Sequence, residues 1–142
     1  MQNIQIRLRL SRLKAFTLFE SLVVLSVVSF VALFLSGSVR QIFRQTEETI
    51  FFMSFERLYK DSQQLAIASH QKVSLQIRED RISNAYQTLS IPDSVRATKP
   101  IRIEFAEHGG NSSLAAVHFD TEEHQVQYQL YLGSGRYKKT IR

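Results

Sequence analysis

The sequence contains no cysteine, and this absence excludes several kinds of site. A chain without cysteine forms no disulfide, holds no metal through thiolates and has no cysteine nucleophile. The compartment stays open, because many exported proteins fold without disulfides. With 142 residues, of which 44% are hydrophobic and 22% charged, the chain has the composition of a single globular domain.

Motifs for catalysis are also missing. The chain has no G-x-S-x-G elbow, no phosphate-binding Walker loop and no C-x-x-C pair. Its four histidines lack metal-ligand spacing such as H-x-x-x-H, and we expect the acids Asp120, Glu122 and Glu123 to form a solvated turn. We therefore expect neither an enzyme nor a bound metal ion or other cofactor. The histidines are His70, His108, His118 and His124.

One long segment lacks charge. The 19 residues from Ser21 to Val39 carry no charged side chain and are rich in valine, leucine and phenylalanine. As a helix that rises about 1.5 Å per residue, they span the hydrocarbon core of a membrane, which is about 30 Å thick. Residues 1–15 hold four bases and no acid, so the start should stay cytoplasmic. The sequence therefore predicts a basic leader over 1–15 and a transmembrane helix over 16–39.

The same segment has a plainer interpretation, as an ordinary signal peptide or a simple membrane anchor. Ser36, Gly37 and Ser38 are small residues at which a signal peptidase could cut. Under this alternative, the rest of the chain would be a signal-anchored or secreted binding domain.

Proline and glycine are absent from residues 40–70, so nothing in that stretch stops a helix. Side chains recur there at alternating steps of four and three, which is typical of one face of an amphipathic helix. They are Phe51, Phe55, Leu58, Ser62, Leu65 and Ser69. We expect one helix over residues 17–70, with its amphipathic continuation over 40–70. The alternative is two helices with a break near Gly37 and Ser38.

From residue 71 onward the period of the apolar side chains changes to two, which predicts strands. Residues 88–100 hold both prolines, Pro92 and Pro100, and are expected to be irregular. The prediction is an α+β fold, in which a long N-terminal α-helix packs on a small, mainly antiparallel β-sheet, with a β-rich head over 71–142. The expected strands cover residues 73–77, 81–86, 101–105, 114–119, 126–132 and 136–141.

A carboxylate interrupts the start of the apolar segment. Glu20 is the fifth residue from Phe16 in the string Lys14-Ala15-Phe16-Thr17-Leu18-Phe19-Glu20. A charged side chain at the centre of a membrane helix costs on the order of 2.5–3.5 kcal/mol by insertion scales, and an ordinary signal peptide gains nothing from it. Intramembrane charges usually mark a partner, so we expect Glu20 to have one.

This string resembles the processing site of type IV prepilins. In that family a membrane peptidase removes a basic leader before an aromatic residue, which is then N-methylated. The resemblance implies a cut between Ala15 and Phe16, N-methylation of Phe16, and pairing of Glu20 with the Phe16 amine of a neighbouring subunit during filament assembly. The family usually has glycine before the cut, and this chain has Ala15 there, so slower cleavage is expected at worst.

The C-terminal strings GGNSSLAAVHFD and HQVQYQLYLGSGRYKKTIR resemble the ends of FimT/GspH-type minor pseudopilins. Together with KAFTLFESLVVLSVVSF, they resemble most the minor pseudopilins of Gram-positive competence systems. That resemblance implies a single-pass membrane precursor with its C-terminus outside, then a subunit of a surface filament that takes up DNA in transformation. A position at the filament tip is our expectation, and a pseudopilin of another type IV filament or of type II secretion is the alternative.

The same resemblance implies a set of partners. They are the major competence pseudopilin, the other minor pseudopilins, the prepilin peptidase, the assembly ATPase with its membrane platform protein, and membrane lipid before assembly. Extracellular DNA, bound without sequence preference, is a further candidate.

The candidate DNA contacts lie in the C-terminal strand. Gly135-Arg136-Tyr137-Lys138 partly resembles a GRxR segment that binds DNA in FimT-like proteins, with Lys138 in place of the second arginine. Cations in this segment could contact phosphates, and Tyr137 could stack on a base. The alternative is a solvated basic tail whose charges protect a sheet edge. The candidate cations are Arg136, Lys138, Lys139 and Arg142.

Overall fold

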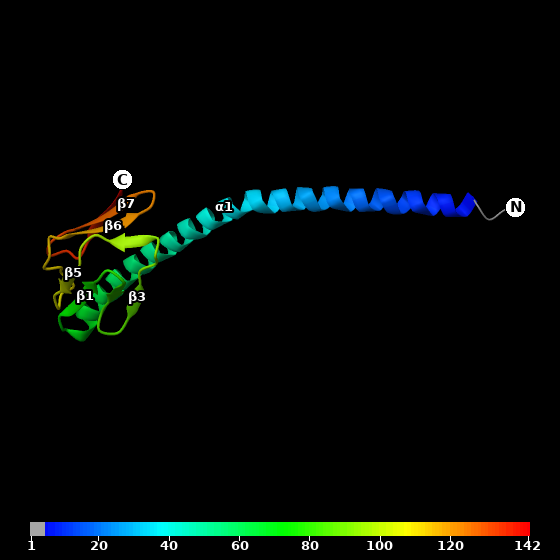
Figure 1. Ribbon diagram of the computed structural model, residues 1–142. Helices are drawn as coiled ribbons and strands as arrows, with labels where there is room; N and C mark the ends of the chain where they lie inside the picture. The colour runs from blue at the N-terminus through cyan, green and yellow to red at the C-terminus, as the bar shows by residue number, and fades with distance from the viewer. Residues whose placement is uncertain (1–4) are drawn as a thin grey trace. The chain divides into compact units, whose positions relative to one another are not determined.

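The computed structural model describes the backbone of residues 5–142 and the side chains of residues 17–37 and 39–142. Over the described residues, the helix α1 (Gln5–Ser69) is followed by eight short strands. Figure 1 shows the helix and labels several of the strands. The chain forms two compact units, Met1–Phe43 and Arg44–Arg142, and the second unit holds all the strands. The α+β fold expected from the sequence is confirmed.

The first unit is helical through its whole described length, and its backbone continues through Gly37 without a break. All its described side chains are exposed, and most are large and apolar. The hydroxyl groups of Ser21, Ser26, Ser29 and Ser36 each donate a hydrogen bond of 2.8 Å to the carbonyl four residues earlier. These polar groups are therefore satisfied within the helix, as a segment surrounded by lipid requires.

The second unit contains two antiparallel four-stranded sheets, in the orders β3-β2-β1-β5 and β4-β6-β7-β8. In the central strands, buried and less buried residues alternate, so each sheet turns one face to the core. The first sheet consists of β1 (Val73–Ile77), β2 (Arg81–Ser83), β3 (Thr88–Ser90) and β5 (Ile101–Phe105). The second consists of β4 (Val95–Ala97), β6 (Ala116–Thr121), β7 (Gln125–Leu130) and β8 (Tyr137–Ile141).

The prediction that residues 88–100 are irregular is wrong, because β3 and β4 lie within them. Each is a three-residue strand at the outer edge of its sheet. Pro92 accepts a hydrogen bond from the backbone of Val95 in the turn before β4, and Pro100 directly precedes β5. Both prolines thus lie outside the strands, where no backbone donor is needed. The strand expected at 114–119 lies at Ala116–Thr121, and the other expected strands differ mainly at their ends.

Aromatic side chains of α1 form the core of the second unit. The Phe55 ring lies 5.2 Å from that of Phe119 and 4.9 Å from that of Tyr128, both in edge-on geometry. The Tyr59 ring lies 4.9 Å from that of Phe105, so the helix packs against both sheets. Such edge-on aromatic pairs add stability beyond the area that they bury.

The expected helical seam is only part of the buried face. Phe51, Phe55, Leu58 and Ser62 are buried as expected, whereas Ser69 at the end of the helix is exposed. Phe52, Tyr59 and Ala66, which lie one position beyond members of the seam, are buried as well. The buried face is wider because the helix covers two sheets.

We expect the substitution Phe55→Ala to lower the free energy of unfolding by about 3–5 kcal/mol, because it opens a cavity under both sheet partners. The measurement is urea unfolding of the full chain in neutral detergent, followed by the near-ultraviolet circular dichroism of its tyrosines. The control is Met53→Ala, since Met53 is on the same helix but 67% exposed, and its effect should stay within about 0.5 kcal/mol. Equal losses for the two variants would contradict the assignment of Phe55 to the core.

Candidate functional site

Glu20 lies in the first unit on the apolar part of α1. Its neighbours Leu18, Phe19 and Leu22 are large, apolar and exposed. No basic residue occurs between Phe16 and Val39, so this stretch of helix offers no cation to the carboxylate. An ionised carboxylate that enters a medium of low dielectric needs a positive partner. Any positive partner of Glu20 would therefore have to come from outside the segment.

The expected cleavage site lies four residues before Glu20. The backbone is helical at both Ala15 and Phe16, and their side chains lie outside the described residues. The cleavage, the N-methylation of Phe16 and the pairing of Glu20 thus stay predictions. Helical spacing places residue 16 one turn before residue 20, on the same side of the helix.

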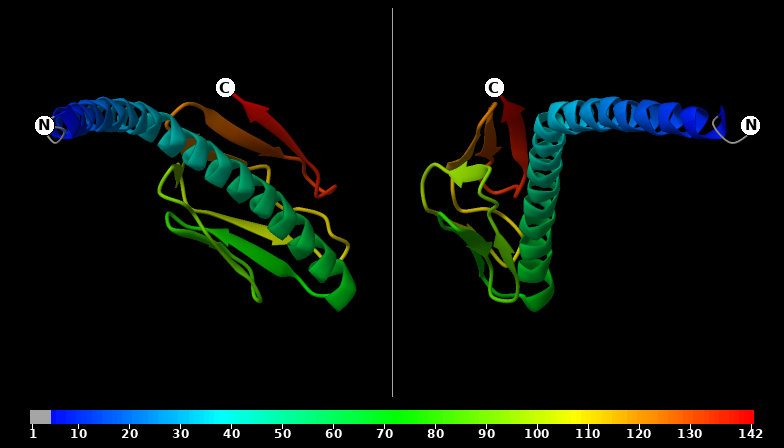
Figure 2. Two further views of the ribbon diagram at one scale, coloured as in Figure 1. Left: turned by 90° about the vertical axis from the view of Figure 1, so that its right-hand side faces the viewer. Right: turned by 45° about the vertical axis from the view of Figure 1, so that its right-hand side comes forward.

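The C-terminal cations separate onto the two faces of β8. Lys139 points toward α1, where its Nζ donates a hydrogen bond of 2.9 Å to Oε1 of Glu56. The ammonium group also lies 5.3 Å from the centre of the Phe52 ring. Figure 2 shows β8 running beside this part of the helix. Lys138 belongs to the other face of the strand and, like Arg136 and Arg142, is exposed.

Glu56, which accepts the hydrogen bond from Lys139, was not predicted from the sequence as a functional residue. The hydroxyl group of Tyr128 donates a second hydrogen bond, of 3.0 Å, to the same Oε1 of Glu56. Burial alone would raise the pKa of Glu56, but hydrogen bonds from Lys139 and Tyr128 and the charge of Lys139 together hold the pKa below its ordinary value. The sequence did contain a signal for this network, because Glu56 directly follows Phe55 of the buried helix face. A carboxylate at the margin of such a face needs a hydrogen-bond donor.

Gly135, the glycine of the Gly-Arg segment, is required by the local backbone conformation and packing. Gly135 has a φ of +61°, a left-handed conformation that favours glycine. A Cβ atom at Gly135 would collide with the side chain of Gln63, whose Nε2 donates a hydrogen bond of 2.8 Å to the carbonyl of Gly109. The glycine thus lets the loop before β8 approach α1 and the loop after β5.

The expectation of a solvated turn at Asp120, Glu122 and Glu123 is only partly right. The turn between β6 and β7 lies against the start of the helix in the second unit. The carboxylate of Glu122 pairs with the guanidinium of Arg44, and Glu123 accepts a hydrogen bond of 3.4 Å from Nε2 of Gln45. Long-range pairs of this kind cannot be seen in the spacing of residues along the chain.

The pKa of the neighbouring carboxylate Glu48 is shifted in the opposite direction to that of Glu56. Glu48 is buried, and its Oε2 lies 3.9 Å from Nε2 of His124. Burial raises the pKa of Glu48, although His124 opposes the shift. Over the described residues, no three histidine, aspartate or glutamate side chains lie close enough to one another to hold a metal ion.

The long apolar helix and the two small antiparallel sheets define a type IV pilin-like α+β protein. By length and composition, α1 could cross a membrane once. Competence protein ComGD of Streptococcus pneumoniae (strain ATCC BAA-255 / R6) is 50% identical to this chain over 129 residues, which cover 91% of this chain and 81% of the relative. The chain therefore belongs to the ComGD family, in agreement with the resemblance of its N-terminal string to competence pseudopilins.

No model of a protein family matches the sequence, and no solved structure matches it either. The relationship to ComGD thus depends on the identity between the two chains.

We expect Glu56→Gln to lower the free energy of unfolding by about 1 kcal/mol at pH 7, because the network is partly exposed and solvent weakens it. A carboxyl with a lowered folded pKa stabilises the fold above its unfolded pKa, for which the ordinary value is 4.5. This stabilisation disappears as the pH falls through the lower folded pKa. The difference between wild type and variant should therefore be full at pH 7 and shrink below about pH 4.5.

The measurement is the urea midpoint of both proteins from pH 7 to pH 3. Glu48→Gln is the matched control, because burial raises the pKa of Glu48 and its ionised form is penalised. That variant should lose no stability at pH 7. A Glu56→Gln deficit of the same size at pH 7 and at pH 3 would rule out the charged network.

Proposed function

We propose that this protein is a minor pseudopilin of a competence pilus, a surface filament for the uptake of extracellular DNA. The basic leader over 1–15 is removed between Ala15 and Phe16, Phe16 is N-methylated, and the helix over 16–39 passes from the membrane into the filament. The family relationship to a competence protein supports the competence role. One observation carries the assembly role: Glu20 is the sole charged side chain of residues 16–39, an apolar segment that contains no base.

Cleavage would supply the missing cation. Removal of the leader creates a positive amine at Phe16, at the depth of the membrane where a neighbouring subunit carries Glu20. Attraction between the two charges is strong where water is excluded, and a carboxylate left without a partner is costly there. The pair would set the axial position of each incoming subunit, while apolar contacts between helices supply most of the cohesion.

The proposed partners follow from this role. They are the major competence pseudopilin and the other minor ones, the prepilin peptidase, and the assembly ATPase with its membrane platform protein. The precursor would sit in the cell membrane with its head outside, and a place at the filament tip is part of the proposal. The exposed apolar surface of the first unit supports a partner of helical, apolar character, because such a surface does not stay in water.

The basic C-terminal strand supports contact with DNA as part of the same role. Arg136, Lys138 and Arg142 are exposed and available to phosphates. The side chain of Lys139 is 34% exposed and forms an ion pair with Glu56. Lys139 would therefore contribute less to DNA binding than the exposed cations. Such contact would be independent of sequence and sensitive to salt.

We expect Glu20→Ala to leave membrane insertion intact and to reduce the protein in surface filaments at least tenfold, because the incoming subunit loses its charged contact. The measurement is immunoblotting of membranes and of sheared filaments from cells that express each variant. The control is Ser21→Ala, which removes an adjacent polar group that bonds only within the helix in the described structure. Normal incorporation of Glu20→Ala would refute the proposed pairing.

A further inference from the structure

The second sheet has one face that the helix does not cover. In β6, Val117 and Phe119 are buried in the core, so His118 and Asp120 belong to the opposite face. The same alternation in β7 buries Val126, Tyr128 and Leu130 and turns three glutamines outward. They are Gln125, Gln127 and Gln129. The result is a row of amide side chains along the centre of an outward polar face.

Cations border this row on the side of β8. Gln129 pairs in register with Lys138, and Gln127 pairs with Thr140. Beyond the end of β8, the backbones of Gln125 and Arg142 exchange two hydrogen bonds of 2.9 Å. Lys138 and Arg142 are both exposed and lie two register positions from Thr140. A cation thus borders each end of the glutamine row.

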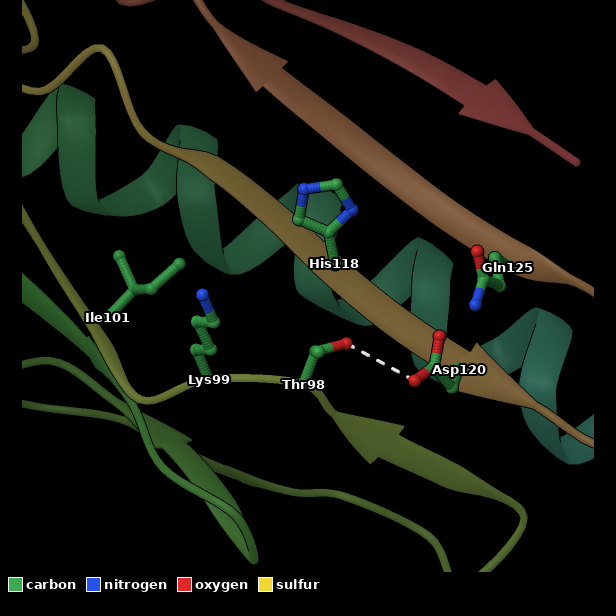
Figure 3. A pocket seen from close by; sticks show the side chains of 6 residues that line it. All are labelled: Thr98, Lys99, Ile101, His118, Asp120 and Gln125. Atoms are coloured by element: carbon green, nitrogen blue, oxygen red, sulfur yellow. Dashed lines mark hydrogen bonds between the residues drawn. The ribbon is translucent and has the colours of Figure 1, made fainter.

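A cleft borders the row on its other side. It has a volume of about 310 Å³ and is shown in Figure 3. Lys99, His118 and Gln125 contribute polar groups to it, and the hydroxyl group of Thr98 donates a hydrogen bond of 3.3 Å to Oδ2 of Asp120. Figure 3 shows these side chains on the side of the sheet turned away from the helix. The exposed ammonium group of Lys99 thus lies across the glutamine row from the cations of β8.

The chemistry of this face matches a phosphate backbone. Arginine, lysine, threonine and glutamine are among the side chains that hydrogen-bond phosphate oxygens in complexes with DNA. The aromatic rings on this side of β6, β7 and β8 are His118 and, one step past the end of β7, the exposed Tyr131, two isolated rings rather than a platform on which successive unpaired bases could stack. Lys99 follows β4, and β4 lies three strand spacings from β8, about 14 Å, so cations at the two borders can reach phosphates on both sides of a groove.

Acidic side chains bound this surface on one side. At β4 and the end of β6 the surface becomes acidic, because four carboxylates line the adjacent hollow with Arg96. They belong to Glu79, Asp80, Asp93 and Asp120. A polyanion would be repelled there, so the contact surface is confined to β7, β8, His118 of β6 and the segment around Lys99.

We propose that this outward face binds the phosphate backbone of duplex DNA, with Lys99 on one border and Lys138 and Arg142 on the other. The proposal rests on the proposed role in DNA uptake and adds the site, the side chains and the form of the nucleic acid. It moves the contact from a C-terminal tail to the face of a sheet. Arg136 lies just before β8, where the backbone of Tyr131 donates a hydrogen bond of 3.0 Å to its carbonyl, so it extends the border of β8 past Lys138.

The test uses the full chain in neutral detergent micelles and a fluorescent DNA duplex of arbitrary sequence, and measures the Kd between 50 and 200 mM salt. Three phosphate contacts predict a loss of affinity of about 40-fold over this range. Lys99→Gln should weaken binding and reduce that loss to about 12-fold, because one contact is removed. Arg57→Gln, which removes an exposed cation of α1, should leave both the Kd and its salt dependence unchanged.

The matched control removes three exposed cations from other surfaces of the second unit, in the variant R57Q/K60Q/R102Q. It should bind DNA like the wild type, and a decrease equal to that of K99Q/K138Q/R142Q would overturn the proposal in favour of net charge alone. Loss of binding in Arg136→Gln with no effect of Lys99→Gln would overturn it in favour of the C-terminal tail. Tighter binding to a single strand of the same length, or equal binding to vesicles of anionic lipid, would contradict the choice of duplex DNA.

Because the assay uses unassembled precursor, it is independent of the filament. Glu20→Ala should bind the duplex normally even though it fails to assemble. A failure of this inference would therefore leave the proposed role in the filament intact, and a failure of assembly would leave this inference intact.

Discussion

A single carboxylate in an apolar helix is the constraint on which the account of this protein depends. Glu20 carries a negative charge among exposed leucine and phenylalanine side chains, and the surrounding segment has no base to neutralise it. In water this arrangement costs little, but in a membrane or in the core of a filament it requires a cation. A new N-terminal amine at Phe16 would meet that requirement only after the leader is removed. The same charge would then couple proteolysis to assembly.

The two parts of α1 differ in what surrounds their apolar side chains. From Leu18 to Phe43 the described apolar side chains of α1 are exposed, whereas from Phe51 onward its aromatic side chains pack in the core against two sheets. The network of Glu56, Tyr128 and Lys139 fastens the last strand to that helix. Because Lys139 points inward and pairs with Glu56, it does not belong to the outward face of the sheet. That face carries the remaining cations and the glutamine row.

Local periodicity predicted most of this fold. The alternation of apolar residues located the long strands, and the steps of four and three located the helix face that carries Phe55. The strands β3 and β4 were missed because each has only three residues and lies near a proline. The pairing of Lys139 with Glu56 and of Arg44 with Glu122 joins residues about eighty positions apart, and spacing along the chain contains no signal for it. The candidate assembly site was found because a charge inside an apolar run is visible in the sequence itself.

The most direct test of the central claim is the mass of the N-terminal peptide of the protein recovered from sheared surface filaments. The account predicts that the chain begins at Phe16 and carries one additional methyl group on its amine. A chain that still carries residues 1–15, or one that begins near Val39, would contradict it, because Glu20 would then have no cation of the proposed kind.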